Sequence, residues 1–302
     1  SNKSRTMLAV LLLFLQSIPF IDGAMINSQV RRVFVSGAGG QTGQHVFRKL
    51  LSLPDEFEPI GVVRTESSKA SLVESGVPES SVMICDVTDA EACAAAMKGC
   101  DAAVICTSAK PAPNGEINEE TGRPVFGFPN GQPEVVDWVG QKNQIDAAKS
   151  VGKSNAHVVI CSSMGGTNPN HPLNNLGKET VSDGTTKGGD ILKWKRKSEK
   201  YLIDSGLPYT IVHPGGLINE PGGKRELCLG VDDKIEGTDN NVVPREDVAS
   251  VLVNALRYEA YRGRSFDLVS KNEGEGTITT DFNALLSSLK EKSADYSLGE
   301  IA

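Results

Sequence analysis

Four glycines in the stretch VFVSGAGGQTGQHV have the spacing of a phosphate-binding turn. Gly37, Gly40 and Gly43 form a GxxGxxG pattern between an apolar, strand-like run and a run with helical spacing. In that context the first glycine permits a tight turn, the second lets the backbone approach a pyrophosphate, and the third lets helix and strand pack closely. The helix N-terminus then faces the phosphates. A ligand-free glycine turn is the alternative; we expect a dinucleotide to bind at Gly37, Gly39, Gly40, Gln41, Thr42 and Gly43.

A cation follows the second apolar run, where the ribose of such a dinucleotide is read. Arg64 ends the run GVVR, with Lys69 nearby. A guanidinium matches the geometry of a 2′-phosphate, whereas sites for NAD usually place an acidic residue here. Glu66 argues the other way, because one residue of slippage would bring its carboxylate to the site. We predict NADPH rather than NADH; the alternative is that Arg64 lies at a strand end and binds nothing.

The ends of the next two apolar runs complete the expected cofactor groove. Asp86 and Val87 follow the third run and are placed to border the adenine. Thr107, Ser108 and Ala109 follow the fourth run, on the nicotinamide side. For Asp86 a role in a turn or helix cap is an equally good interpretation.

The cation-rich segment ILKWKRKSE carries a lysine that lies apart from the other cations. At roughly 100° per residue, the apolar stripe of the expected helix holds Ile191, Trp194, Tyr201 and Leu202. The opposite, solvated side holds Lys193, Arg196, Lys197 and Lys200. Lys195 lies along the edge of the apolar stripe. On this helix alone, a lysine that covers the core with its stem while its ammonium reaches water is the simpler interpretation.

The elements that must position these residues alternate along the chain. Strand-like runs occupy residues 31–36, 58–64, 81–87, 101–108, 156–163 and 208–214. Helical patterns occupy residues 41–53, 67–75, 90–98, 133–151 and 190–205. Short apolar strands that alternate with helices predict a doubly wound α/β fold, in which helices cover both faces of a parallel sheet.

The regular alternation is interrupted by two long segments, residues 110–132 and 165–189, and it loosens after residue 214. Both segments follow the carboxyl end of a strand, where ligands bind in open α/β sheets. The first contains GRPVFGF, whose Arg123, Phe126 and Phe128 could cover the nicotinamide or pack on the fold. A helix at 244–259, a strand at 264–269 and a last amphipathic helix predict a small C-terminal substrate lobe.

Composition excludes some partners and leaves others open. The chain has 302 residues, 39% of them hydrophobic and 23% charged, with a formal charge of −7. A negative protein lacks the basic surface for a non-specific hold on nucleic acid or anionic lipid. No CxxC pair or cysteine–histidine cluster suggests a metal. We expect the cysteines to be reduced and structural, and Cys93 and Cys100 could form a disulfide only if the geometry allowed it. The six cysteines are Cys85, Cys93, Cys100, Cys106, Cys161 and Cys228.

Residues 1–29 form a leader-like segment that we set apart from residues 30–302. Two basic residues precede a nine-residue apolar run, Met7 to Leu15, which is too short to span a bilayer. This layout is that of a signal peptide, yet unpaired cysteines fit secretion poorly. Cytosol or plastid stroma fits better, and the oligomeric state stays open.

Several motifs together make a family resemblance. GAGGQTG, CDVTDAEACAAAMKGCDAAVICTS, WVGQKNQIDAAKSVG, CSSMGG, KRKSEKYLIDSGLPYTIVHPGGL and VPREDVA resemble the atypical short-chain dehydrogenase/reductases of the NmrA-like kind. The likeness is greatest to small NAD(P)-binding proteins of plants and algae, and it runs from about residue 31 to 289. It implies a single NAD(P)-binding Rossmann domain.

In relatives of this family a serine, a tyrosine and a lysine carry catalysis. By resemblance Ser163 takes the serine position, with Ser162 beside it, and Lys195 takes the lysine position that holds the cofactor ribose. This reverses the simpler interpretation of Lys195. The tyrosine is missing, because Ile191 stands four residues before Lys195 and cannot donate a proton. His213 is a candidate substitute donor.

Two functions therefore stay open. The first is an NADPH-dependent oxidoreductase of a small, planar or quinone-like acceptor, in which His213, His171 or water replaces the tyrosine as proton source. The second is a non-catalytic NADP(H)-binding redox sensor or plastid assembly protein that binds a protein partner. The missing tyrosine favours the second function, and Ser163 mildly favours the first.

Overall fold

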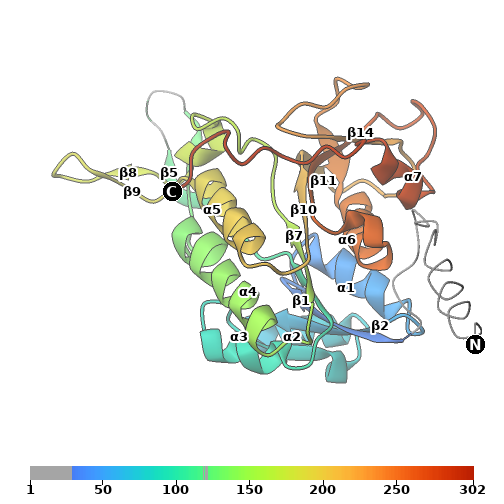
Figure 1. The fold of residues 1–302 in the computed structure, drawn as a ribbon. Coiled ribbons are helices and arrows are strands. Elements are labelled where there is room, and N and C mark those ends of the chain that lie inside the picture. The colour runs from blue at the N-terminus through green and yellow to red at the C-terminus, as the bar shows by residue number, and fades with distance from the viewer. Residues whose placement is uncertain (1–28, 118, 120–121) are drawn as a thin grey trace, which may run out of the picture.

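The computed structural model describes residues 29–117, 119 and 122–302 of the chain (Figure 1). The leader-like segment expected over residues 1–29 lies outside them except for its last residue. Within the described ranges, no helix combines the length and the hydropathy that crossing a bilayer requires.

An eight-stranded sheet forms the centre of the molecule. Its strands neighbour one another in the order β12-β14-β10-β7-β4-β1-β2-β3. Seven of them run parallel and β12 runs antiparallel to β14. The bounds are β1 Arg31–Ser36, β2 Phe57–Val63, β3 Val82–Ile84, β4 Ala102–Ile105, β7 His157–Cys161, β10 Tyr209–Pro214, β12 Leu227–Gly230 and β14 Arg264–Ser270. This is the doubly wound fold that the sequence predicts.

Two apolar layers sandwich the sheet because alternate strand residues point to opposite faces. Val33 and Val35 of β1 belong to the layer beneath α1 (Gly43–Leu51) and α6 (Arg245–Arg257). Phe34 belongs to the other layer, beneath α3 (Ala90–Met97), α4 (Gln141–Ser150) and α5 (Ile191–Asp204). Figure 1 shows α4 and α5 lying side by side on one side of the sheet, with α1 and α6 on the other.

The strand order reverses between β1 and β4, and this places the expected ligand groove. From β1 the chain adds β2 and β3 in one direction, then returns to add β4, β7, β10 and β14 in the other. In open α/β sheets, ligands bind outside the carboxyl ends of the strands where the order reverses in this way. The glycine turn follows β1 directly, so it lies at this switch point.

A hairpin lies in each of the two long segments, and a π-helix follows the first segment. β5 (Ala112–Ile117) pairs with β6 (Pro124–Gly127), and β8 (Glu179–Thr180) pairs with β9 (Thr186–Lys187). The helix expected at 133–151 begins as the π-helix η2 (Glu134–Gly140) before it continues as α4. π-Helical turns inside α-helices are frequent at functional sites.

The remaining short elements lie before β3, between the hairpins, and mainly after β10. They are η1 (Glu79–Ser81), α2 (Glu66–Glu74), η3 (Pro172–Asn175), β11 (Gly216–Ile218), β13 (Val242–Pro244), η4 (Glu259–Tyr261) and α7 (Phe282–Ser287).

Candidate functional site

The glycine turn between β1 and α1 admits no side chain at its critical positions. Gly37 has φ +66°, a left-handed conformation that favours glycine. A Cβ on Gly43 would lie 2.1 Å from the carbonyl oxygen of Gly37. The N–H of Gly40 donates to that same oxygen at 2.7 Å, which closes the turn. Thr42 provides no side-chain cap to α1. The N–H groups of Gln44 and His45 bind the carbonyl oxygens of Gly40 and Thr42, so the N–H groups of the turn itself are the ones placed for a ligand.

Arg64 directly follows β2, in the register that the prediction of a 2′-phosphate site requires. Its side chain is exposed and donates from Nη1 to the carbonyl oxygen of Asn130 at 2.8 Å. Glu66 begins α2, and the hydroxyl of Thr65 caps that helix by accepting from the N–H of Ser68 at 3.2 Å. Arg64 and Glu66 are thus both exposed close to the end of β2, and Arg64 is held toward Asn130.

The residues after β3 form a compact turn. Oδ1 of Asp86 accepts hydrogen bonds from the N–H of Thr88 at 2.9 Å and from its hydroxyl at 2.8 Å. Val87 is buried, and its carbonyl oxygen accepts from Asn143 Nδ2 at 3.1 Å. The turn role foreseen for Asp86 is thus present in the structure, at the edge where an adenine is expected.

The segment after β4 is fixed from two directions. The hydroxyl of Thr107 lies 3.3 Å from that of Ser36 and accepts from Gln144 Nε2 at 3.2 Å. The N–H of Ala109 donates to Oδ2 of Asp137 at 2.9 Å. Ser108 is exposed between them. These hydrogen bonds hold Thr107 and Ala109, on either side of Ser108, in one conformation.

Lys195 is not a lysine that reaches water. It is 6% exposed, and its Nζ lies 2.8 Å from Oδ1 of the fully buried Asp137. Asp137 therefore joins α5 to the segment after β4, since its other oxygen binds Ala109. We did not foresee Asp137 from the sequence: it lies inside the predicted helix 133–151, and no local pattern distinguishes it.

Apolar side chains surround the position of the missing tyrosine. Ile191 begins α5 and packs in a buried cluster with Ala109, Phe128 and Leu192. Phe128 is thus part of the fold, whereas Phe126 and Arg123 in the same segment are exposed. Of the two phenylalanines in this segment, one packs on the fold and the other is exposed to solvent.

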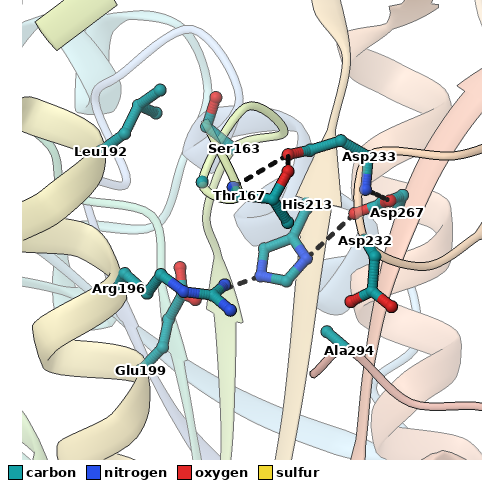
Figure 2. Close-up of a pocket in the computed structure, with 11 residues that line it drawn as sticks. Ser163, Thr167, Leu192, Arg196, Glu199, His213, Asp232, Asp233, Asp267 and Ala294 are labelled. Carbon is teal, nitrogen blue, oxygen red and sulfur yellow. Dashed lines mark hydrogen bonds and ion pairs between the residues drawn. The ribbon is translucent and has the colours of Figure 1, made fainter. Parts of the chain in front are cut away.

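A small polar cavity lies at the carboxyl ends of β7, β10 and β14. It encloses about 10 Å³, room for about one water molecule, so an organic acceptor does not fit inside it. Figure 2 shows its lining, in which the hydroxyl of Ser163 donates to the carbonyl oxygen of Met164 at 3.0 Å. Ser162 instead turns into the protein and donates to Glu199. The lining residues are Ser163, Gly166, Thr167, Leu192, Arg196, Glu199, His213, Asp232, Asp233, Asp267 and Ala294.

His213 is enclosed between two carboxylates. Its Nδ1 lies 3.2 Å from Asp267 Oδ1 and its Nε2 lies 3.2 Å from Glu199 Oε2 (Figure 2). Burial lowers the pKa of His213, but the two carboxylates outweigh it and raise the pKa to about 10. Burial raises the pKa of Glu199, but the His213 charge and hydrogen bonds lower it to about 2. Both ring nitrogens are engaged, so His213 can donate a proton only by breaking an ion pair.

His171, the other histidine considered, serves local structure. Its Nδ1 accepts from the N–H of Leu173 at 3.3 Å and caps η3, and its ring packs against Gly165. Glu199 was also missed from the sequence. Helical spacing carried a signal for it, because Glu199 follows Lys195 by one turn along the same edge of α5.

The prediction that Arg196 lies on a solvated face is wrong. Arg196 is 3% exposed, and its Nε donates to the carbonyl oxygen of Leu298 at 2.8 Å. Its guanidinium lies 4.5 Å from the ring centre of Tyr296. The reason is that residues 293–300, which we call the covering segment, lie across this side of α5. Lys193 binds the same segment through Glu300 at 2.7 Å.

These residues fit a dinucleotide and leave the acceptor position apolar. The glycine turn leaves backbone N–H groups for a pyrophosphate, and Arg64 has an exposed guanidinium at the ribose end. Lys195 and Asp137 form a rigid charged pair at the opposite end. No hydroxyl stands at Ile191 to give a proton to a carbonyl oxygen.

Comparisons with known proteins show the family to which the chain belongs. A family model described as NAD(P)H-binding matches residues 37–259. An uncharacterized chloroplastic protein of Arabidopsis thaliana is 47% identical over 271 residues, across 89% of this chain and 78% of its own. Sanguinarine reductase of Eschscholzia californica is 44% identical over 280 residues, across 86% of this chain and 97% of its own. A structure from Bacillus halodurans, assigned as an NAD-dependent epimerase/dehydratase, shares the fold with a TM-score of 0.57 at 23% identity, across 86% of this chain and all of that one.

Proposed function

The chain belongs to the NAD(P)H-binding family, and from that premise we propose that it is an NADPH-dependent reductase of a small, planar organic acceptor. The observation that carries the proposal is the 44% identity to sanguinarine reductase along 97% of that enzyme. The glycine turn supports it, because the left-handed φ of Gly37 and the 2.1 Å approach of a Cβ at Gly43 require glycine at both positions. The bound cofactor supplies the hydride. Residues 30–302 act as one unit in this proposal, with the lobe after β10 bordering the acceptor.

Arg64 supports the preference for NADPH over NADH. It is an exposed cation at the carboxyl end of β2, where a ribose 2′-phosphate is read in this fold. To reach a phosphate, its guanidinium exchanges the carbonyl oxygen of Asn130 for phosphate oxygens, which form stronger, charge-assisted hydrogen bonds. Thr65 and Ser68 stand beside it with hydroxyl groups 2.9 Å apart.

Lys195 and Asp137 hold the nicotinamide ribose in this proposal. The ammonium donates to ribose oxygens while Asp137 fixes its position from behind. Ser163, at the rim of the polar cavity, is the group placed to steady the acceptor. His213 supports the site by holding Glu199 and Asp267 in place, and it does not contact the acceptor.

The proton source limits the class of acceptor. Ile191 removes the usual donor, and the nearest imidazole has both nitrogens bound to carboxylates. The acceptor is therefore one that tolerates proton delivery from water, such as a quinone, or one that needs no proton when hydride adds to it. The cluster of Ala109, Phe128 and Ile191 offers an apolar wall to a planar ring.

The test is turnover of NADPH with a panel of acceptors. We expect loss of NADPH absorbance with sanguinarine, the named substrate of the relative, or with quinones, and none with simple aldehydes that need a proton donor. The Gly43→Ala variant is the control for oxidation that does not depend on the cofactor turn. Tight NADPH binding without turnover of any acceptor would overturn the reductase and favour a non-catalytic NADP(H)-binding protein.

We propose a plastid location because the Arabidopsis relative is chloroplastic. Imaging the full-length natural protein fused at its C-terminal side to a fluorescent protein would check this. Signal in the cytosol alone would contradict it.

A further inference from the structure

Two cysteines lie beside each other at the carboxyl ends of β4 and β7, next to the glycine turn. Ile105 of β4 pairs with Ile160 of the adjacent parallel strand β7, so the next residues along, Cys106 and Cys161, come opposite each other. Both side chains point to the α1 and α6 side of the sheet. Adjacent strands run about 4.7–4.9 Å apart, within the 4.4–6.8 Å that disulfides usually span between Cα atoms.

Cys106 also packs directly against the glycine turn. A Cβ on Gly37 would lie 2.9 Å from the carbonyl oxygen of Cys106, and a Cβ on Gly43 would lie 3.2 Å from the Cβ of Cys106. The backbone of Cys106 is therefore in close contact with the turn that is expected to face the pyrophosphate. Any displacement of Cys106 toward Cys161 therefore moves atoms on which the cofactor turn rests.

The chemical environment divides the two thiols into different roles. The hydrogen bond from Cys106 lowers the pKa of Cys161 against the opposing effect of burial, and the Lys195 charge lowers it further. The same pairing, together with burial, raises the pKa of Cys106. Cys161 is accordingly the thiol that ionises first, and thiolates are the nucleophiles in thiol oxidation. Both residues are half-buried.

We propose that Cys106 and Cys161 form a redox-active dithiol that a peroxide oxidises to a disulfide, and that the disulfide weakens dinucleotide binding. The Cys161 thiolate attacks one peroxide oxygen, the O–O bond breaks, and hydroxide leaves and takes up the proton that Cys161 gave up, forming water. The Cys106 sulfur then attacks the resulting sulfenic acid, and its hydroxyl leaves as a second water with the Cys106 proton. Two thiols and one peroxide thus give one disulfide and two waters.

A second thiol pair provides the internal comparison. Cys85 and Cys93 have their sulfurs 4.0 Å apart, but their residues are 3% and 0% exposed. What distinguishes the Cys106–Cys161 pair is its place against the glycine turn. The inference concerns the cofactor turn and not the acceptor. It is therefore independent of the proposed reductase activity.

The experiment treats the reduced full chain with hydrogen peroxide and maps the linkage by mass spectrometry. We expect a loss of two hydrogen masses, a Cys106–Cys161 linkage, and an NADPH dissociation constant raised at least about fivefold, the lower end of usual coupling between sites. Dithiothreitol should restore both values. NADPH added before peroxide should slow oxidation, because coupling between two sites is reciprocal.

Matched variants separate this pair from the other cysteines. Cys161→Ser should bind NADPH like the reduced wild type and lose its response to peroxide, whereas Cys228→Ser, on the distant strand β12, should keep the response. A linkage of Cys85 to Cys93 alone, or no disulfide, would overturn the dithiol. A Cys106–Cys161 disulfide with unchanged NADPH affinity would overturn its coupling to the cofactor turn. Both comparisons can be made on the wild type, so they do not depend on a variant folding.

Discussion

Lys195 Nζ and Asp137 Oδ1 lie 2.8 Å apart in a part of the site where both side chains are almost fully buried. The pair connects α5 to η2, and the second oxygen of Asp137 extends the connection to the N–H of Ala109. A lysine held in this way has little rotational freedom left. Its ammonium is therefore pre-positioned for the cofactor before any ligand arrives, which reduces the ordering cost of binding.

Breaking this pair should be costly for stability. Asp137→Ala leaves a buried ammonium without its partner, and such losses cost about 3–5 kcal/mol. Lys195→Met should cost less in the Asp137→Ala background than alone, because the two charges then disappear together. Urea unfolding of both single variants and the double variant gives the interaction free energy.

The matched control for that cycle is the exposed pair Lys200–Asp204 on the same helix, with 3.1 Å between Nζ and Oδ2. Its interaction should contribute no more than about 0.5 kcal/mol, as for other exposed i,i+4 pairs. Equal interaction energies for the two pairs would contradict a special role for Asp137.

Gly43→Ala should abolish the cofactor turn. The added Cβ would lie 2.1 Å from a backbone oxygen, so the turn itself has to move. We expect NADPH affinity, followed by nicotinamide fluorescence, to fall at least roughly tenfold, a change of about 1.4 kcal/mol. Gly127→Ala is the control, since its Cβ would come no closer than 3.8 Å to a neighbour. Wild-type affinity in Gly43→Ala would refute the assignment of the turn.

Arg64→Ala should weaken NADPH binding and leave NADH binding unchanged. A hydrogen bond to a charged group contributes about 1.5–3 kcal/mol, so we expect NADPH affinity to fall about 10- to 100-fold. Arg48→Ala, which removes an arginine that binds Ser75 on the surface, should change neither affinity. A parallel loss of NADH and NADPH affinity would mean that Arg64 only supports the fold.

The His213 ion pairs should make stability depend on pH in a defined window. The folded pKa of about 10 lies above the ordinary value of 6.5, so the contribution is full below pH 6.5 and is lost as pH rises toward about 10. His213→Gln removes the group. The free energy of unfolding of the wild type should therefore exceed that of the variant most below pH 6.5, and the excess should shrink above it. A pH-independent difference would show that the imidazole is not charged in the folded protein.

The parallel sheet, the order of its strands and helices along the chain, and the glycine turn can be predicted from the sequence, because they depend on local patterns. A strand such as RRVFVS and the glycine spacing are each recognisable within a few residues. The angular position of Lys195 on its helix also predicts that it leaves the solvated side. Its partner could not be foreseen, since Asp137 is 58 positions away and reaches Lys195 through a π-helix that no local pattern announces.

The prediction that Arg196 lies on a solvated face is wrong for a related reason. Helical spacing says which residues share a face, but it does not say what covers that face. The covering segment follows Arg196 by about a hundred residues, and it binds the guanidinium through two backbone carbonyls and the ring of Tyr296, with no carboxylate on Arg196 itself. Long-range contacts to carbonyl groups leave no residue-type signature.

The contact between Arg196 and Leu298 also sets an order of events during synthesis. The two residues are 102 positions apart, so at about 5–20 residues per second the ribosome needs roughly 5–20 s between them. During that interval α5 can pack on the sheet while its outer side, with the Arg196 guanidinium, is still uncovered. The side of α5 that carries Arg196 therefore stays uncovered until almost the whole chain has been made.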